Sequence, residues 1–129
     1  MYPAIVRGDI VLCDRFADST YAYQGWGRGA PLGKVMRLDD LVLEGFQPDH
    51  TLFFDITLEE SERRLQLRPG TQDRFDAAER AFRRRVWQGY QQRFRHHPGR
   101  MVRVDAMQDH DGVRAQLLTW VHETFPAIR

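Results

Sequence analysis

Cysteine and lysine are nearly absent from this sequence, and it has neither a long apolar run nor an excess of one charge. The single cysteine, Cys13, excludes a disulfide framework and suits a reducing, cytoplasmic compartment. No apolar run approaches the ~18 residues of a membrane span, and the N-terminus lacks a signal-peptide core. A net charge of +1 gives no reason to expect a nucleic-acid partner. The 129 residues therefore suit one cytoplasmic domain without membrane or nucleic-acid partners.

The basic residues are almost all arginines, because Lys34 is the only lysine among nineteen basic residues. Arginine binds phosphate oxygens in pairs through its planar fork, whereas lysine acts as a point charge. A general arginine bias explains most of this count. The positions of the arginines, and not their number, must therefore argue for a function.

Strand and helix patterns alternate along the chain. Continuous apolar runs predict buried strands at residues 9–14, 50–56 and 101–105. Apolar spacing and caps at Thr57 and Asp111 predict helices at 17–24, about 35–45, 57–67, about 78–96 and 111 onward. This alternation predicts an α/β fold with a parallel sheet and right-handed crossovers. Three strands are few for such a sheet, so truncation on its N-terminal side is one interpretation.

Acidic residues end all three predicted strands, where ligands of open parallel sheets bind. Asp55 and Asp105 follow the second and third strands, and Asp55 is equally well explained as part of the next helix start. The pair Asp14-Arg15 is harder to explain in this way, because residues 18–20 are better placed to begin the helix. Such a pair can hold a phosphate through its guanidinium and a hydrated cation through its carboxylate.

Arginines also surround a break at Pro69-Gly70. Arg64 and Arg68 share one helix face, where two like charges cost a few tenths of a kcal/mol unless an anion lies between them. A solvated basic face is the plain alternative, but the adjacent hinge favours a lid that closes over phosphate. Gly33-Lys34-Val35 is not a P-loop, because a valine stands where Ser or Thr is required.

Residues 14–25 (DRFADSTYAYQG) resemble the signature of bacterial thymidylate kinases. The similarity continues through residues 27–29, 48–49, 73–76 and 104–106, in register over essentially the whole chain. It implies the C-terminal part of a three-layer, parallel-sheet fold of the P-loop nucleoside monophosphate kinase type, N-terminally truncated. Residues 1–129 would form this one domain, with a lid segment at about 64–76.

The resemblance implies ATP-dependent phosphorylation of dTMP to dTDP in dTTP biosynthesis, with Mg²⁺. Arg15 would hold the dTMP phosphate, and Asp14 would lie near the metal. Thr20 would contact the thymine edge. The other substrate-binding residues implied are Ser19, Tyr23 (beneath the sugar), Gln24, Asp73 and Arg74.

On the ATP side, Arg64 and Arg68 are similar to lid arginines that stabilise charge on the transferring group. The adenine would lie against the loop Asp105, Ala106 and Met107. A homodimer is also implied. Asp76 stands where the family usually has Glu, which puts that contact in doubt.

The family's opening strand and its Gly-rich phosphate loop with lysine have no counterpart in these 129 residues. We therefore expect negligible kinase activity from this chain alone, because the ATP phosphates lack oriented donors. Three alternatives stay open. The chain is a kinase for another pyrimidine deoxynucleotide, a non-catalytic nucleotide-phosphate-binding or interaction fragment, or the product of a reading frame that starts upstream.

Overall fold

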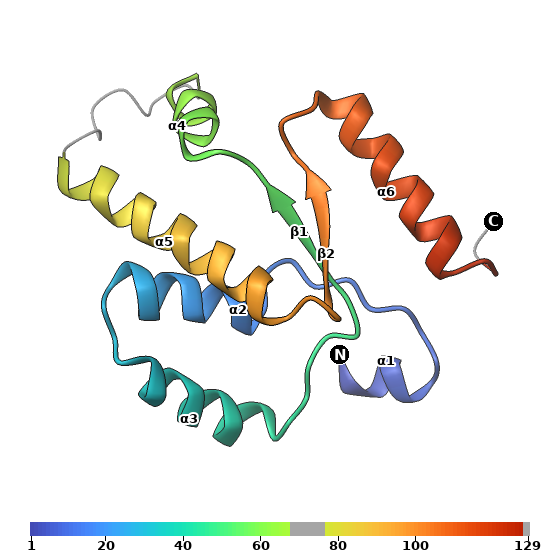
Figure 1. Cartoon of the computed structure of the whole chain (residues 1–129). Coiled ribbons are helices and arrows are strands. Elements are labelled where there is room, and N and C mark those ends of the chain that lie inside the picture. The colour runs from blue at the N-terminus through green and yellow to red at the C-terminus, as the bar shows by residue number, and fades with distance from the viewer. Residues whose placement is uncertain (68–76, 128–129) are drawn as a thin grey trace.

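A two-stranded parallel sheet lies at the centre of the molecule. The computed structural model describes residues 1–67 and 77–127. Strand β1 (Thr51–Asp55) pairs with β2 (Met101–Asp105), with Thr51 opposite Met101 and Asp55 opposite Asp105. Within these described residues, seven helical elements surround the strands (Figure 1): α1 (Tyr2–Val6), α2 (Ala17–Thr20), the π-helix η1 (Tyr21–Gly27), α3 (Leu32–Leu43), α4 (Leu58–Gln66), α5 (Ala77–His96) and α6 (His110–Thr124).

The second and third predicted strands are confirmed, and so is their parallel pairing. The predicted helices after each of them are also present. Thr57 caps α4, because its Oγ1 accepts a hydrogen bond from the backbone N–H of Glu60. The cap predicted for the last helix is wrong by two residues. Asp109 and not Asp111 caps α6, since its Oδ1 lies 2.8 Å from the Gly112 nitrogen.

The first predicted strand, 9–14, is wrong. These residues have no regular structure, and the side chains of Ile10 and Leu12 are 53% and 92% exposed. An apolar run records a preference for burial, but a strand also needs a neighbour to share its hydrogen bonds. Among the described residues, β1 pairs only with β2. The structure therefore supports an α/β arrangement with a small parallel sheet.

The N-terminal part of the chain is more helical than its pattern predicts. Helix α1 begins with Pro3 in its first turn, a position that proline favours. The predicted helix 17–24 is a single α-turn that continues as the π-helix η1 to Gly27, three residues beyond its predicted end. On α3, Val35 is buried, whereas Leu38 and Leu41 on the same apolar face are exposed.

The core forms where α5 packs against η1 and β1. Phe94 stacks on Phe53 of β1 with 5.2 Å between ring centroids, and the Trp87 indole donates to the Ile56 carbonyl at 2.8 Å. Gly89 lets α5 approach η1 closely, because a Cβ there would lie 2.9 Å from the Cα of Ala22. Figure 1 shows α5 alongside α2, and α6 on the other side of the strands in this view. Within the described residues, no helix is long and apolar enough to cross a membrane.

Candidate functional site

Arg15 lies just before α2 with its side chain exposed and oriented by two contacts. Its Nε donates to the Ser19 hydroxyl at 3.2 Å, and its guanidinium carbon lies 4.5 Å from the centre of the Tyr23 ring. Its backbone has a φ of 69°, which costs an L-residue about 1–2 kcal/mol. No carboxylate of residues 1–67 and 77–127 forms an ion pair with it. The terminal nitrogens of the guanidinium are therefore placed to bind an external anion.

The two residues that contact Arg15 are themselves supported by α5. The Ser19 hydroxyl lies 2.9 Å from the Tyr90 hydroxyl, across 71 residues of sequence. Tyr23 packs edge-on against Tyr90 and against Phe82, with ring centroids 6.2 Å and 6.1 Å apart. The arginine, its two neighbours and α5 thus form one continuous network of contacts.

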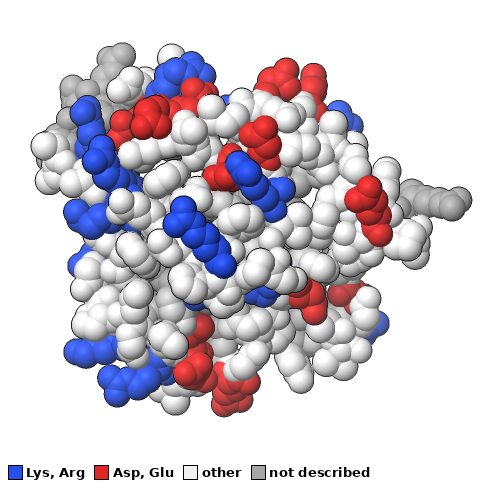
Figure 2. All heavy atoms as spheres, in the orientation of Figure 1, with Lys and Arg blue, Asp and Glu red and all other residues white. Residues whose placement is uncertain are grey.

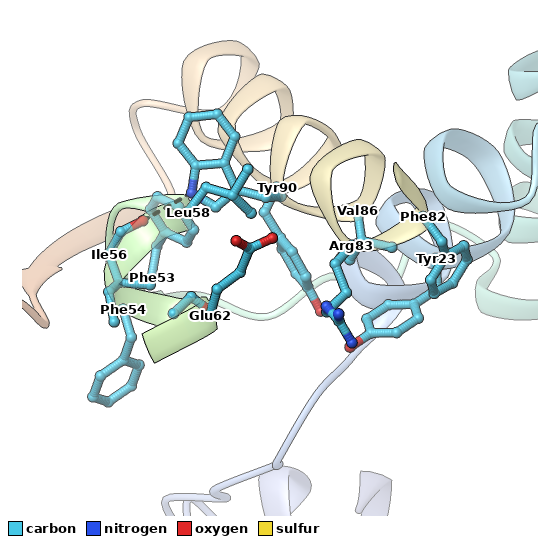
Figure 3. Close-up of a pocket in the computed structure, with 12 residues that line it drawn as sticks. Tyr23, Phe53, Phe54, Ile56, Leu58, Glu62, Phe82, Arg83, Val86 and Tyr90 are labelled. Atoms are coloured by element: carbon cyan, nitrogen blue, oxygen red, sulfur yellow. Dashed lines mark hydrogen bonds between the residues drawn. The ribbon is translucent and has the colours of Figure 1, made fainter. Parts of the chain in front are cut away.

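A cavity of about 290 Å³ opens beside this network, between β1, α4, α5 and η1 (Figure 3). This is close to the ~300 Å³ at the lower end of small-molecule sites. Tyr23 and Tyr90 are shared between the cavity and the Arg15 network, which brings the guanidinium next to an aromatic hollow. Its aromatic walls are Tyr23, Phe53, Phe54, Phe82, Trp87 and Tyr90.

Two other predicted substrate residues lie away from this cavity. Thr20 lines a smaller one, of about 210 Å³, between α2 and α3, together with Phe16, Val35 and Asp39. The side chain of Gln24 is exposed. Helical geometry explains the separation, since positions 19 and 23 share one face and point toward α5.

A buried ion cluster anchors α2 next to the site. Asp18 is 5% exposed and pairs with Arg93 at 2.8 Å and with Arg100 at 2.9 Å. The Arg93 guanidinium also lies 4.0 Å from the Tyr21 ring centre. Burial by itself raises the pKa of Asp18. The hydrogen bonds and charges of Arg100 and Arg93 outweigh that effect, so the pKa lies below its ordinary value.

The predicted lid falls largely outside the described residues. This applies to Arg68, Asp73 and Arg74 and to the hinge beside them, whose roles stay predictions. Arg64 is described, and its Nε pairs with Glu60 at 2.7 Å. Hydrogen bonds from Arg63 and then Arg64 lower the pKa of Glu60 to about 2. The anion beside these arginines is thus an internal carboxylate in this structure.

The predicted adenine loop forms a turn at the carboxyl end of β2. The Asp105 carboxylate accepts a hydrogen bond from the Met107 nitrogen at 3.0 Å, and the Ala106 nitrogen donates to the Asp55 carbonyl at 2.9 Å. Ala106 is buried, whereas Met107 is 48% exposed. Asp55 is held internally, with Gln91 at 2.7 Å and Arg103 at 2.8 Å. Hydrogen bonds thus hold the turn together, and Met107 is its exposed apolar side chain.

Asp14, the predicted metal ligand, is an exposed carboxylate next to Arg15. Over residues 1–67 and 77–127, no group of three or more His, Cys, Asp or Glu side chains is arranged to hold a metal. On the face shown in Figure 2, acidic and basic groups are interspersed, and neither sign forms one continuous field. This face therefore carries no extended field of one sign that would attract an anion.

Comparison with known proteins matches residues 1–117 to the protein-family model described as thymidylate kinase. The chain belongs to the thymidylate kinase family. Three curated thymidylate kinases illustrate the similarity. That of Paracidovorax citrulli is 43% identical over 93% of this chain, and that of Lactobacillus delbrueckii is 39% identical over 98% of it. That of Pseudomonas putida is 43% identical over 89% of it. The chain spans only 58%, 60% and 54% of these relatives' lengths, respectively.

The family resemblance drawn from the sequence is confirmed, and within it the structure brings Arg15, Ser19 and Tyr23 together. Sequence reasoning missed Tyr90, which lies within the helix predicted at about 78–96 but was given no role in the site. A signal for it exists, since a buried tyrosine hydroxyl usually finds a hydrogen-bond partner. The Asp18 cluster has no comparable signal, because its arginines lie 75 and 82 residues away.

Proposed function

We propose that this chain carries the substrate side of a thymidylate kinase, which phosphorylates dTMP to dTDP with ATP in dTTP biosynthesis. The observation that carries the proposal is the setting of Arg15. Its guanidinium is fixed by a hydroxyl and an aromatic ring, has no carboxylate partner among the described residues, and adjoins a cavity. A fixed fork without an internal anion suits a phosphate.

Each side chain would contribute position and charge, and none would act as a nucleophile. The attacking atom is a phosphate oxygen of dTMP itself, and phosphoryl transfer depends on alignment and charge neutralisation. Arg15 would hold that phosphate beside the attacking oxygen. Tyr23 would lie beneath the sugar, Thr20 and Gln24 would face the base, and Ser19 would hold Arg15. Asp73 and Arg74 would complete the substrate contacts.

On the ATP side, Arg64 and Arg68 would neutralise charge on the transferring group once Arg64 leaves Glu60. The turn Asp105 to Met107 would lie along the adenine. Asp14 is an oxygen donor of the kind Mg²⁺ prefers, and one carboxylate is sufficient where substrate phosphates and water complete the shell. When bound, Mg²⁺ would add positive charge at the phosphates.

The same proposal includes the architecture and surroundings of the family. The two strands would belong to a three-layer parallel sheet of the P-loop nucleoside monophosphate kinase type. The enzyme would be a cytoplasmic homodimer, in keeping with the single cysteine. Light scattering of the purified chain tests the dimer, and a monomer at all concentrations up to the micromolar range contradicts it.

Calorimetry with the purified chain tests substrate recognition. We expect dTMP to bind at least about tenfold more tightly than thymidine, because hydrogen bonds to charged groups are strong. Arg15→Ala should abolish this preference, whereas Arg114→Ala, on the exposed surface of α6, should leave it intact. Equal binding of dTMP and thymidine contradicts the proposal, and no heat with either indicates an interaction fragment. Titrations with dUMP and dCMP decide the base.

A steady-state assay with ATP and Mg²⁺ tests the activity of the chain by itself. We expect no dTDP above the Arg15→Ala background, because these 129 residues hold no Gly-rich loop with lysine for the ATP phosphates. Turnover above that background would show that the phosphates are oriented by other groups.

A further inference from the structure

Tyr90 contacts both of the groups that orient Arg15. Its hydroxyl lies 2.9 Å from the Ser19 hydroxyl, and its ring packs edge-on against Tyr23. Ser19 in turn accepts the hydrogen bond of the Arg15 Nε, and the Tyr23 ring lies under the guanidinium. A single side chain on α5 therefore supports the arginine through two separate contacts.

The chemistry of the three groups fixes how this support works. Arginine has only donors, so the Ser19 oxygen must act as acceptor toward it. The serine proton is then turned away from Arg15. Among the described residues, Tyr90 is the one hydrogen-bond partner that the Ser19 hydroxyl has on that side. Without the Tyr90 hydroxyl, Ser19 can rotate to other rotamers, and the arginine loses its fixed acceptor.

The backbone of α5 comes close enough to η1 to allow the contact between Tyr90 and Ser19. Gly89, next to Tyr90, is buried where α5 meets η1, and a Cβ there would lie 2.8 Å from the Cβ of Trp26. The close approach brings Tyr90 within hydrogen-bond distance of a residue 71 positions earlier.

We propose that Tyr90 is a positioning residue for substrate phosphate, acting through Ser19 on Arg15. This inference rests on the proposed function, because it assumes that Arg15 binds the phosphate of dTMP. It also assigns Ser19 to the arginine, since its hydroxyl bonds both Arg15 and Tyr90 in this structure. Tyr90 should therefore influence phosphate binding and leave nucleoside binding unchanged.

Calorimetric titration of the 129-residue chain with dTMP and with thymidine tests this assignment. Tyr90→Phe keeps the ring against Tyr23 and removes the hydroxyl. We expect it to weaken dTMP binding about three- to tenfold, the effect of one hydrogen bond, with thymidine affinity unchanged. The matched control is Tyr21→Phe, which also loses a hydrogen-bonded hydroxyl, 3.0 Å from Asp39, outside the Arg15 network. It should leave the ratio of the two affinities unaltered.

A second variant links the effect to Ser19. Ser19→Ala should lower the same ratio of dTMP to thymidine affinity. Adding Tyr90→Phe to Ser19→Ala should cause no further loss, because the Tyr90 hydroxyl acts on Arg15 only through Ser19. Ser19→Ala also tests the path if Tyr90→Phe does not fold. An unchanged ratio in Tyr90→Phe, or additive losses in the double variant, overturns the assignment. If the unmodified chain itself binds dTMP no better than thymidine, the proposed function fails instead.

Discussion

The Asp18 ion cluster should dominate the stability of the segment that carries the candidate site. The Asp18 side chain is 7% exposed, and it neutralises two guanidinium groups that are themselves mostly buried. Asp18→Asn keeps the shape of the side chain and removes its charge. Arg93 and Arg100 would then face each other's charge without a counterion. Breaking a buried pair in this way costs about 3–5 kcal/mol.

That loss is large beside the total stability of a small domain, about 5–15 kcal/mol. Urea unfolding followed by circular dichroism measures it directly, provided that the transition is two-state. The matched control is Asp49→Asn, an exposed carboxylate, for which we expect a change within about 0.5 kcal/mol. A loss in Asp18→Asn no greater than in the control would refute the argument that this charge is energetically important.

The same carboxylate should make stability depend on pH in a defined direction. The pKa of Asp18 is lowered in the folded chain by its hydrogen bonds to Arg100 and Arg93, against the opposing effect of burial. A carboxyl with a depressed folded pKa contributes its full stabilisation above the unfolded value of about 3.9 and loses it as pH falls through the folded pKa. The stability difference between the original chain and Asp18→Asn should therefore shrink below about pH 4. A difference that stays constant from pH 7 to pH 3 would contradict this.

Two further substitutions test the packing and the caps. Gly89→Ala should destabilise the chain by about 1–3 kcal/mol, because its new Cβ would lie 2.8 Å from the Cβ of Trp26. Gly99→Ala meets open space and is the control in the same thermal melts. Asp109→Ala should cost about 1 kcal/mol in urea unfolding through loss of the α6 cap, and Asp111→Ala should cost less. A larger loss in Asp111→Ala than in Asp109→Ala would instead support Asp111, the cap predicted from the sequence.

The sequence predicts this fold well where one local pattern is sufficient. The runs at 50–56 and 101–105 become paired strands, and Thr57 caps the helix that its pattern predicts. The run at 9–14 is also apolar, yet Leu12 is almost fully exposed, because an apolar run does not show which strand a segment pairs with. The exposed Leu41 on α3 makes the same point for helices, since periodicity defines a face and not its partner.

The candidate site likewise has a part that the local sequence predicts and a part that it does not. Arg15, Ser19 and Tyr23 lie within nine residues of sequence, so their motif is visible without any knowledge of the fold. Tyr90 and Arg93 meet this segment only because α5 packs across it. No local pattern encodes which side chains two distant helices bring together. The network that positions the arginine is therefore a property of the tertiary structure.

Helix α5 holds the site segment through two neighbouring contacts, and these should have separable effects. Arg93 pairs with Asp18, which forms no ion pair with Arg15, whereas the Tyr90 hydroxyl bonds Ser19, which accepts a hydrogen bond from Arg15. Asp18→Asn, measured where the variant is still folded, should lower the free energy of unfolding and leave the ratio of dTMP to thymidine affinity within about twofold. Tyr90→Phe should do the opposite, with a changed ratio and a loss of stability of only about 1 kcal/mol. If both variants lower the ratio equally, α2 moves as one rigid unit. Phosphate binding would then depend on how α2 packs against α5 and not on the Ser19 hydroxyl.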